Sequence, residues 1–141
     1  MSASTIALVV ALVAAAINGL AAALGALRWW QVESSRAFWV LARAGQAASG
    51  VLAVAAGVLA VTGFDPIDGL FWLYALLPAL VGFMAEQLRL GAAVQVLEHR
   101  GIPNARAVGG LPEAQQRSVV LAIVRRELGV MTLAAGVVAL L

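Results

Sequence analysis

The sequence has no cysteine, no lysine and only one histidine in 141 residues. The missing cysteines exclude disulfides, thiolate metal sites and cysteine nucleophiles. The single histidine, His99, excludes a bis-histidine haem or a multi-histidine metal site. No phosphate-binding glycine loop, nucleophile elbow or zinc motif is present either. The sequence therefore predicts no catalytic residue, no metal and no cofactor, and an enzyme is the least favoured interpretation.

Charged residues are also scarce, at 11% of the chain, whereas hydrophobic residues make up 63%. Soluble domains average roughly 25% charged and 45–50% apolar residues. Each of four apolar runs approaches or exceeds the roughly 20 residues that a helix needs to cross a bilayer. These runs are Ile6–Leu27, Phe38–Thr62, Leu70–Ala85 and Val119–Leu141. We therefore expect an all-α integral membrane protein in which residues 1–141 form a single four-helix transmembrane bundle.

Capping residues predict where these helices begin. Ser34 or Ser35 suits the start of the second helix, Asp65-Pro66 the third and Pro112 the fourth. The expected transmembrane helices cover about residues 5–28, 36–62, 66–99 and 112–141. A helix of about 30 residues is roughly 45 Å long and exceeds the bilayer. We therefore expect the third and fourth helices to extend into a short cytoplasmic hairpin, with Gly101–Leu111 at its tip.

The distribution of arginine predicts the orientation of the bundle. All nine basic residues lie in or beside the first and third connections, at positions Arg28, Arg36, Arg43, Arg89, Arg100, Arg106, Arg117, Arg125 and Arg126. The second connection carries only Asp65 and Asp68. The positive-inside rule then places both termini outside. We expect a multi-pass protein of a bacterial cell (inner or plasma) membrane, with membrane lipids and no nucleic acid as partners.

Polar side chains are predicted to share one layer near the cytoplasmic edge of the bilayer. Counting 1.5 Å per residue from each outer helix end places Gln46, Glu86 and Glu127 at depths of about 21–24 Å. Arginines from three of the helices lie within a turn of this depth. The candidate layer comprises Arg43, Gln46, Glu86, Arg89, Arg125 and Glu127.

This layer has two interpretations. In the first, Arg43 and Arg125 pair with Glu86, and Arg89 pairs with Glu127, so that the layer only fixes the register of the helices. In the second, the excess of arginine leaves a positive pocket for an anion such as a lipid phosphate or a carboxylate substrate. Arg126 lies within a turn of the same depth, so that four arginines stand against two carboxylates, but its position on the fourth helix directs it toward lipid headgroups.

The remaining signals concern contacts between helices. Asn18 lies near the midplane of the first helix and needs a polar partner, either on another helix or on a substrate. Gly50, Ala53 and Gly57 form a small-residue face that suits close helix contact. We therefore expect a non-catalytic packing or accessory subunit, or a homo-oligomeric scaffold. The alternative is a small transporter or a lipid- or anion-binding membrane protein that uses the arginine-rich layer.

Overall fold

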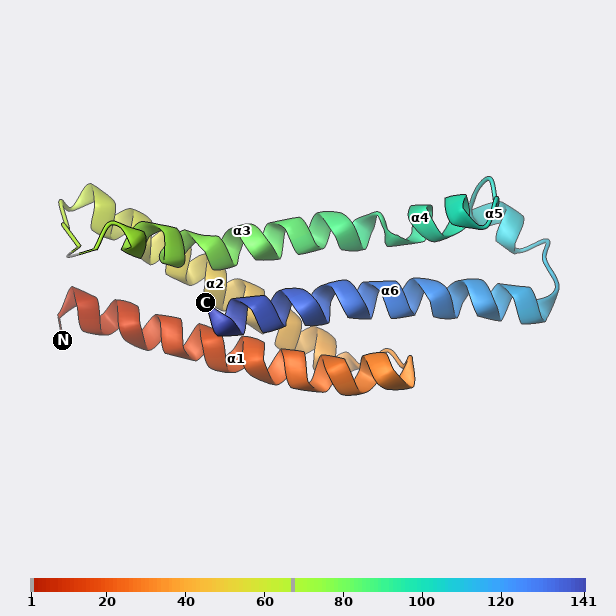
Figure 1. Cartoon of the computed structure of the whole chain (residues 1–141), viewed down its shortest axis with the longest axis horizontal. Coiled ribbons are helices and arrows are strands. Elements are labelled where there is room, and N and C mark those ends of the chain that lie inside the picture. Colours follow the sequence, from red (N-terminus) through yellow and green to blue (C-terminus); the bar gives the residue numbers. More distant parts are fainter. Residues whose placement is uncertain (1, 67) are drawn as a thin grey trace.

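The computed structural model describes residues 2–66 and 68–141, and all the regular elements in this part of the chain are α-helices (Figure 1). They are α1 (Ala3–Gln31), α2 (Arg36–Val61), α3 (Leu70–Leu90), α4 (Ala92–His99), α5 (Ala105–Val108) and α6 (Glu113–Leu140). Helices α1, α2, α3 and α6 lie side by side, and α6 packs against both α1 and α3. Helix α4 continues the direction of α3, and α5 lies at the tip of the α4–α6 hairpin.

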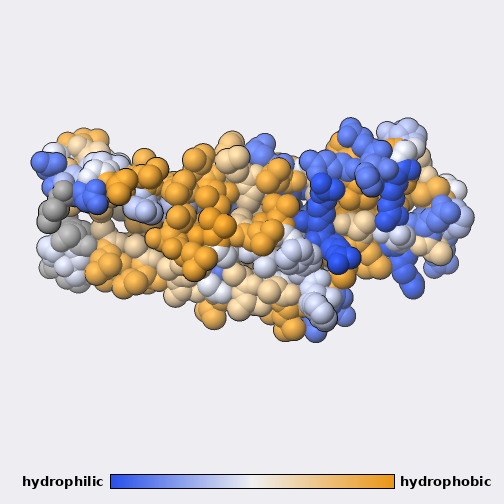
Figure 2. All heavy atoms as spheres, in the orientation of Figure 1, coloured by the Kyte–Doolittle hydropathy of each residue, from blue (hydrophilic) through white to orange (hydrophobic). Residues whose placement is uncertain are grey.

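Three of the helices are long and apolar enough to cross a membrane, over Thr5–Gln31, Arg36–Val61 and Leu70–Leu90. Helix α6 is not among them, because Arg125, Arg126 and Glu127 divide its uncharged residues into two shorter runs, Ser118–Val124 and Leu128–Leu140. Figure 2 shows the same division on the surface. Hydrophobic residues predominate over the middle of the bundle, and hydrophilic residues gather at its ends and over the α4–α6 hairpin. This pattern is compatible with a multi-pass membrane protein.

The helix boundaries agree with the sequence in part. Ser35 caps α2, where its side chain accepts a hydrogen bond from the backbone N–H of Phe38. The third helix begins at Leu70 rather than at residue 66, and the carboxylate of Asp68 accepts a hydrogen bond from its first N–H. Residue 67, inside the predicted span, lies outside the described residues. The predicted continuous helix 66–99 is divided at Gly91 into α3 and α4.

Three glycines allow the helices to approach closely. A Cβ atom on Gly45 of α2 would lie 2.6 Å from the side-chain oxygen of Asn18, and one on Gly129 of α6 would lie 3.1 Å from the ring of Trp29. A Cβ on Gly25 of α1 would overlap the side chains of two other helices. A larger residue at Gly25 or Gly45 would therefore have to displace the side chains that meet it, and one at Gly129 would need the Trp29 ring to shift by a few tenths of an ångström.

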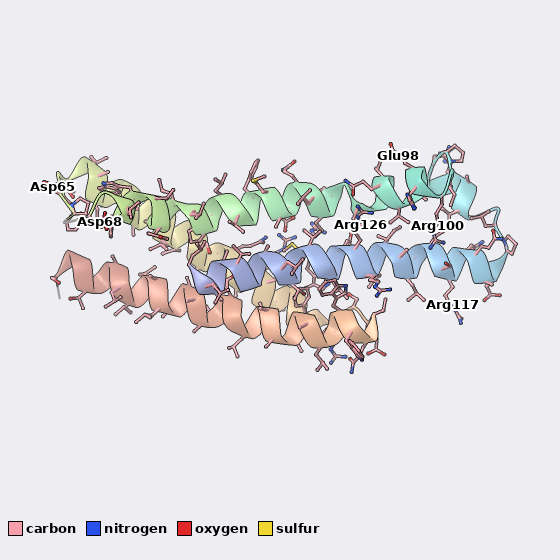
Figure 3. The ribbon with its side chains drawn as sticks, in the orientation of Figure 1. Asp65, Asp68, Glu98, Arg100, Arg117 and Arg126 are labelled. Carbon is pink, nitrogen blue, oxygen red and sulfur yellow. The ribbon has the colours of Figure 1, made fainter. Side chains whose placement is uncertain are left out.

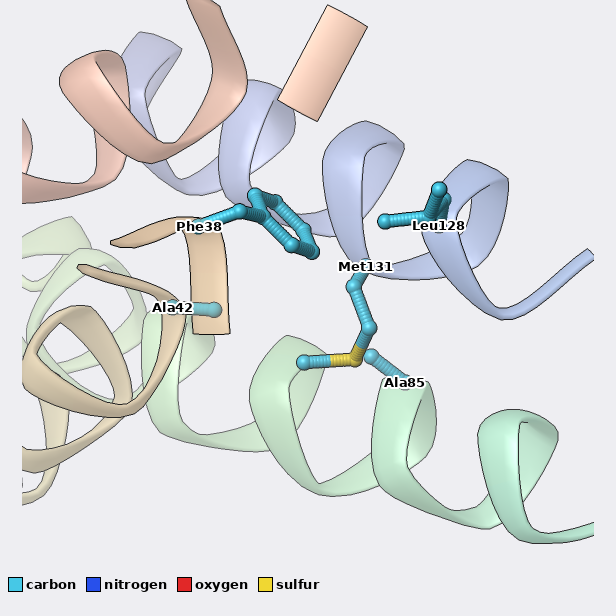
Figure 4. Packing of buried hydrophobic residues seen from close by; sticks show 5 residues of the cluster. All are labelled: Phe38, Ala42, Ala85, Leu128 and Met131. Carbon is cyan, nitrogen blue, oxygen red and sulfur yellow. The ribbon is translucent and has the colours of Figure 1, made fainter. Parts of the chain in front are cut away.

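A cluster of buried side chains fixes the axial position of α6 (Figure 4). It joins Phe38 and Ala42 of α2, Ala85 of α3, and Leu128 and Met131 of α6. Met131, rather than Glu127, is therefore the α6 residue beside Ala85. Further along, a Cβ on Gly19 of α1 would lie 3.9 Å from that of Ala139 in α6. The last turn of α6 thus lies beside the middle of α1.

Candidate functional site

Four of the six predicted layer residues form one hydrogen-bonded network between α2 and α3. The Glu86 carboxylate accepts hydrogen bonds from Arg43 Nη1 at 2.7 Å and from Gln46 Nε2 at 3.0 Å, both through Oε1. Its other oxygen accepts from Arg89 Nε at 3.1 Å and from Arg89 Nη2 at 2.9 Å. Arg43 also donates to the side-chain oxygen of Gln46 at 2.9 Å. A single carboxylate therefore holds two guanidinium groups.

Arg89 is the more strongly fixed of the two arginines. Its side chain is 21% exposed, as is that of Glu86, whereas the Arg43 side chain is 52% exposed. The guanidinium carbon of Arg89 also lies 5.5 Å from the centre of the Trp39 ring on α2, within the range of a cation–π contact. Because Arg89 and Glu86 are half-buried, their attraction is screened less by water than that of an exposed pair.

A cavity of about 290 Å³ adjoins this network, between α2, α3 and α6. Its wall is mostly small or apolar, and its polar side chains are Asn18, Gln46, Ser49 and Glu86. Asn18 Nδ2 donates hydrogen bonds to the carbonyl of Ala14 at 2.8 Å and to that of Gly45, on α2, at 3.4 Å. Ser49 Oγ donates to the same Gly45 carbonyl at 3.0 Å. The amide of Asn18 thus bonds to the backbone of its own helix and, by a longer contact, to that of the neighbouring α2.

The two layer residues of α6 do not join the network. The predicted pairs Arg125–Glu86 and Arg89–Glu127 are wrong, because the ion pairs of the described residues are Arg28–Glu33, Arg43–Glu86 and Arg89–Glu86. The physical reason is the position of α6, which brings Met131 to the level of Glu86. Arg89 instead contacts the ring of Trp39. Glu127 is half-buried, and its side chain forms no hydrogen bond with the described part of the chain.

Arg125 lies in a second group of basic residues that the sequence did not reveal. It lines two neighbouring surface hollows along α6, and Arg100, the residue that caps the end of α4, lines both as well. The first hollow lies between α6, α4 and Trp29 of α1, and the second lies between α6 and Val32, which follows α1. His99 and Arg126 border the first hollow, and Arg117 borders the second. Arg100 and Arg125 are far apart in sequence, so only the α4–α6 hairpin brings them together. Most of the predicted excess of positive charge therefore lies outside the layer, in this groove, and the layer keeps one arginine more than it has carboxylates.

Within residues 2–66 and 68–141, no three His, Asp or Glu side chains gather in a way that suits a metal ion. Comparison of the chain with protein-family models, with curated proteins and with solved structures found no match. The features that bear on function are therefore the geometry of the two basic groups and the surfaces of the helices.

Proposed function

We propose that the chain is a non-catalytic membrane protein that works by packing against other helices, as a homo-oligomeric scaffold or an accessory subunit of a membrane complex. In this proposal α1, α2 and α3 cross the cell membrane and form a four-helix bundle with α6. The arginine-bearing connections face the cytoplasm, and both termini are directed outward. The α4–α6 hairpin extends on the cytoplasmic side.

The observation that carries the proposal is a small-residue face of α2 that the described residues pack only loosely. A Cβ atom on Gly50 or Gly57 would meet no atom within 4 Å, whereas one on Gly25 or Gly45 would collide with neighbouring side chains. Small residues on membrane helices allow the close backbone contacts that hold such helices together. The chain uses this device internally at Gly25 and Gly45. Gly50 borders the cavity between α2, α3 and α6, Ala53 is half-buried and Gly57 is exposed. In this proposal a helix of another chain therefore approaches the loosely packed face from the Gly57 end.

The polar groups support the same proposal. Glu86 is held by two arginines and Gln46, and Asn18 bonds to the backbone of α2. These groups fix helices against one another, as polar residues in membrane bundles do. A network of this kind favours a structural role for the layer over a catalytic one.

The test compares two double variants that each add two leucines seven residues apart. Gly50→Leu with Gly57→Leu fills the loosely packed face, including the side of the cavity at Gly50, whereas Ala16→Leu with Ala23→Leu changes exposed positions of α1. We expect native mass spectrometry in mild detergent to show the wild type and the α1 variant as an oligomer or bound to a partner chain. The α2 variant should no longer form this complex. A wild type that is always a lone chain, or equal behaviour of the two variants, would contradict the proposal.

A further inference from the structure

A groove along α6, bordered by the end of α4 and the end of α1, gathers several basic side chains. Its two hollows have volumes of about 470 and 480 Å³. Both are lined by Arg100 and Arg125. Arg126, His99 and Arg117 stand at their borders. We call this surface the basic groove.

The arginines of the basic groove have no acidic partners. None of them takes part in the ion pairs of the described residues, and Arg100 donates instead to the hydroxyl of Ser118 at 2.8 Å. Figure 3 shows Arg100 and Arg126 between α4 and α6, with Glu98 on the other side of α4. Positive charges gathered without a counter-charge repel one another, so an anion that binds among them is attracted by several at once.

One wall of the basic groove is apolar. Trp29 of α1, together with Val130 and Leu133 of α6, lines the same hollow as Arg100 and Arg125. The side chain of Leu133 is 60% exposed and lies one to two turns beyond Arg126 toward the apolar part of the bundle. Tryptophan is typical of the headgroup level of a bilayer. The groove therefore runs from a basic end to an apolar surface.

We propose that the basic groove binds the phosphate of an anionic phospholipid. Guanidinium groups match a phosphate because they offer two parallel N–H donors and a permanent charge. In this assignment Arg100 and Arg125 donate to the phosphate oxygens, and the Ser118 hydroxyl keeps Arg100 in place. An acyl chain then lies along Val130 and Leu133. This apolar wall favours a lipid over free phosphate, which has no apolar part to bury.

The site is independent of the proposed packing function, because it shares no residue with the Gly50–Gly57 face. The test uses the purified full chain in mild detergent, with phosphatidylglycerol, phosphatidylcholine and inorganic phosphate as probes. The site variant is Arg100→Gln with Arg125→Gln. The control is Arg36→Gln with Arg106→Gln, which removes the same charge from two exposed arginines that line neither hollow.

We expect native mass spectrometry to show phosphatidylglycerol bound in preference to phosphatidylcholine. The site variant should weaken this binding at least about tenfold, and the control should change it about twofold or less. Excess inorganic phosphate should compete only weakly.

Three results would overturn the proposal. The first is an equal loss of phosphatidylglycerol binding in the site variant and the control. The second is equal binding of the two lipids by the wild type. The third is full displacement of the lipid by inorganic phosphate, which would identify a site for a soluble anion. Circular dichroism of both variants checks that they fold. If the site variant does not fold, the Arg125→Lys variant is measured in its place. Lysine keeps the positive charge but lacks the two parallel donors of arginine, so an unchanged affinity for phosphatidylglycerol would contradict the assignment.

Discussion

The two groups of arginine in this molecule lie close together along the bundle but differ in what surrounds them. Arg43 and Arg89, between α2 and α3, share the carboxylate of Glu86. Arg100 and Arg125, between α4 and α6, have no carboxylate partner among the described residues. The first group is therefore expected to hold the fold together, and the second to be free for a ligand. The position of an arginine along the bundle therefore does not by itself show whether it stabilises the fold or binds a ligand.

The largest effect on the stability of the fold is expected from the loss of the Glu86 carboxylate, which Arg43 and Arg89 share. Glu86→Ala leaves two guanidinium groups without a counter-charge, one of them half-buried, and should lower the free energy of unfolding by about 2–3 kcal/mol. The figure is below that of a fully buried pair because water reaches Arg43. Thermal unfolding in one detergent measures the loss.

A matched double variant sharpens this prediction. Combining Glu86→Ala with Arg89→Ala removes the half-buried charge as well, so part of the stability should return. If the two losses simply add, then Glu86 does not act through Arg89, and the structural role of the first group is wrong.

A smaller effect is expected at the ring beneath Arg89. Trp39→Leu removes the cation–π contact with Arg89 and the edge-to-face contact with Phe38, whose ring centre lies 5.2 Å away. The expected loss is about 1–2 kcal/mol. Trp30→Leu serves as the control because Trp30 is 89% exposed, and it should cost under about 0.5 kcal/mol. Equal melting temperatures for the two tryptophan variants would show that Trp39 contributes nothing through these contacts.

The smallest effects are expected in the basic groove. Arg125→Ala and Arg126→Ala each remove an exposed guanidinium that has no ion-pair partner, so each should change the free energy of unfolding by under about 1 kcal/mol. Unfolding in lipid-free detergent is the appropriate measurement, because bound lipid would add its own stabilisation. A loss above about 2 kcal/mol for Arg125→Ala would mean that this arginine holds the fold.

The sequence predicted the first group well because α2 and α3 are joined by a short connection. Counting residues outward from that connection gives nearly the same depth on both helices, so the Arg43–Glu86 pair could be predicted. The bond from Arg89 to Glu86 was also within reach, since the two are three residues apart on one helix. The prediction had instead assigned Arg89 to Glu127.

The second group could not be found by counting. The predicted depth of Arg125 and Glu127 assumed that α6 reaches the outer surface, whereas its last turn lies beside the middle of α1. Packing sets this position, through Met131 against Ala85, and no spacing in the sequence shows it. The meeting of Arg100 with Arg125 depends on the same hairpin.

The most direct test of the difference between the two groups is a paired measurement of Arg89→Gln and Arg125→Gln. Both variants lose one positive charge and receive the same shorter, polar side chain. The structure predicts that Arg89→Gln lowers the melting temperature in lipid-free detergent by several degrees, because a loss of about 1 kcal/mol shifts it by roughly 4 °C in a chain of this size. Arg125→Gln should leave the melting temperature unchanged. Equal shifts, or a larger one for Arg125→Gln, would contradict the division of the arginines into a structural and a ligand-binding group.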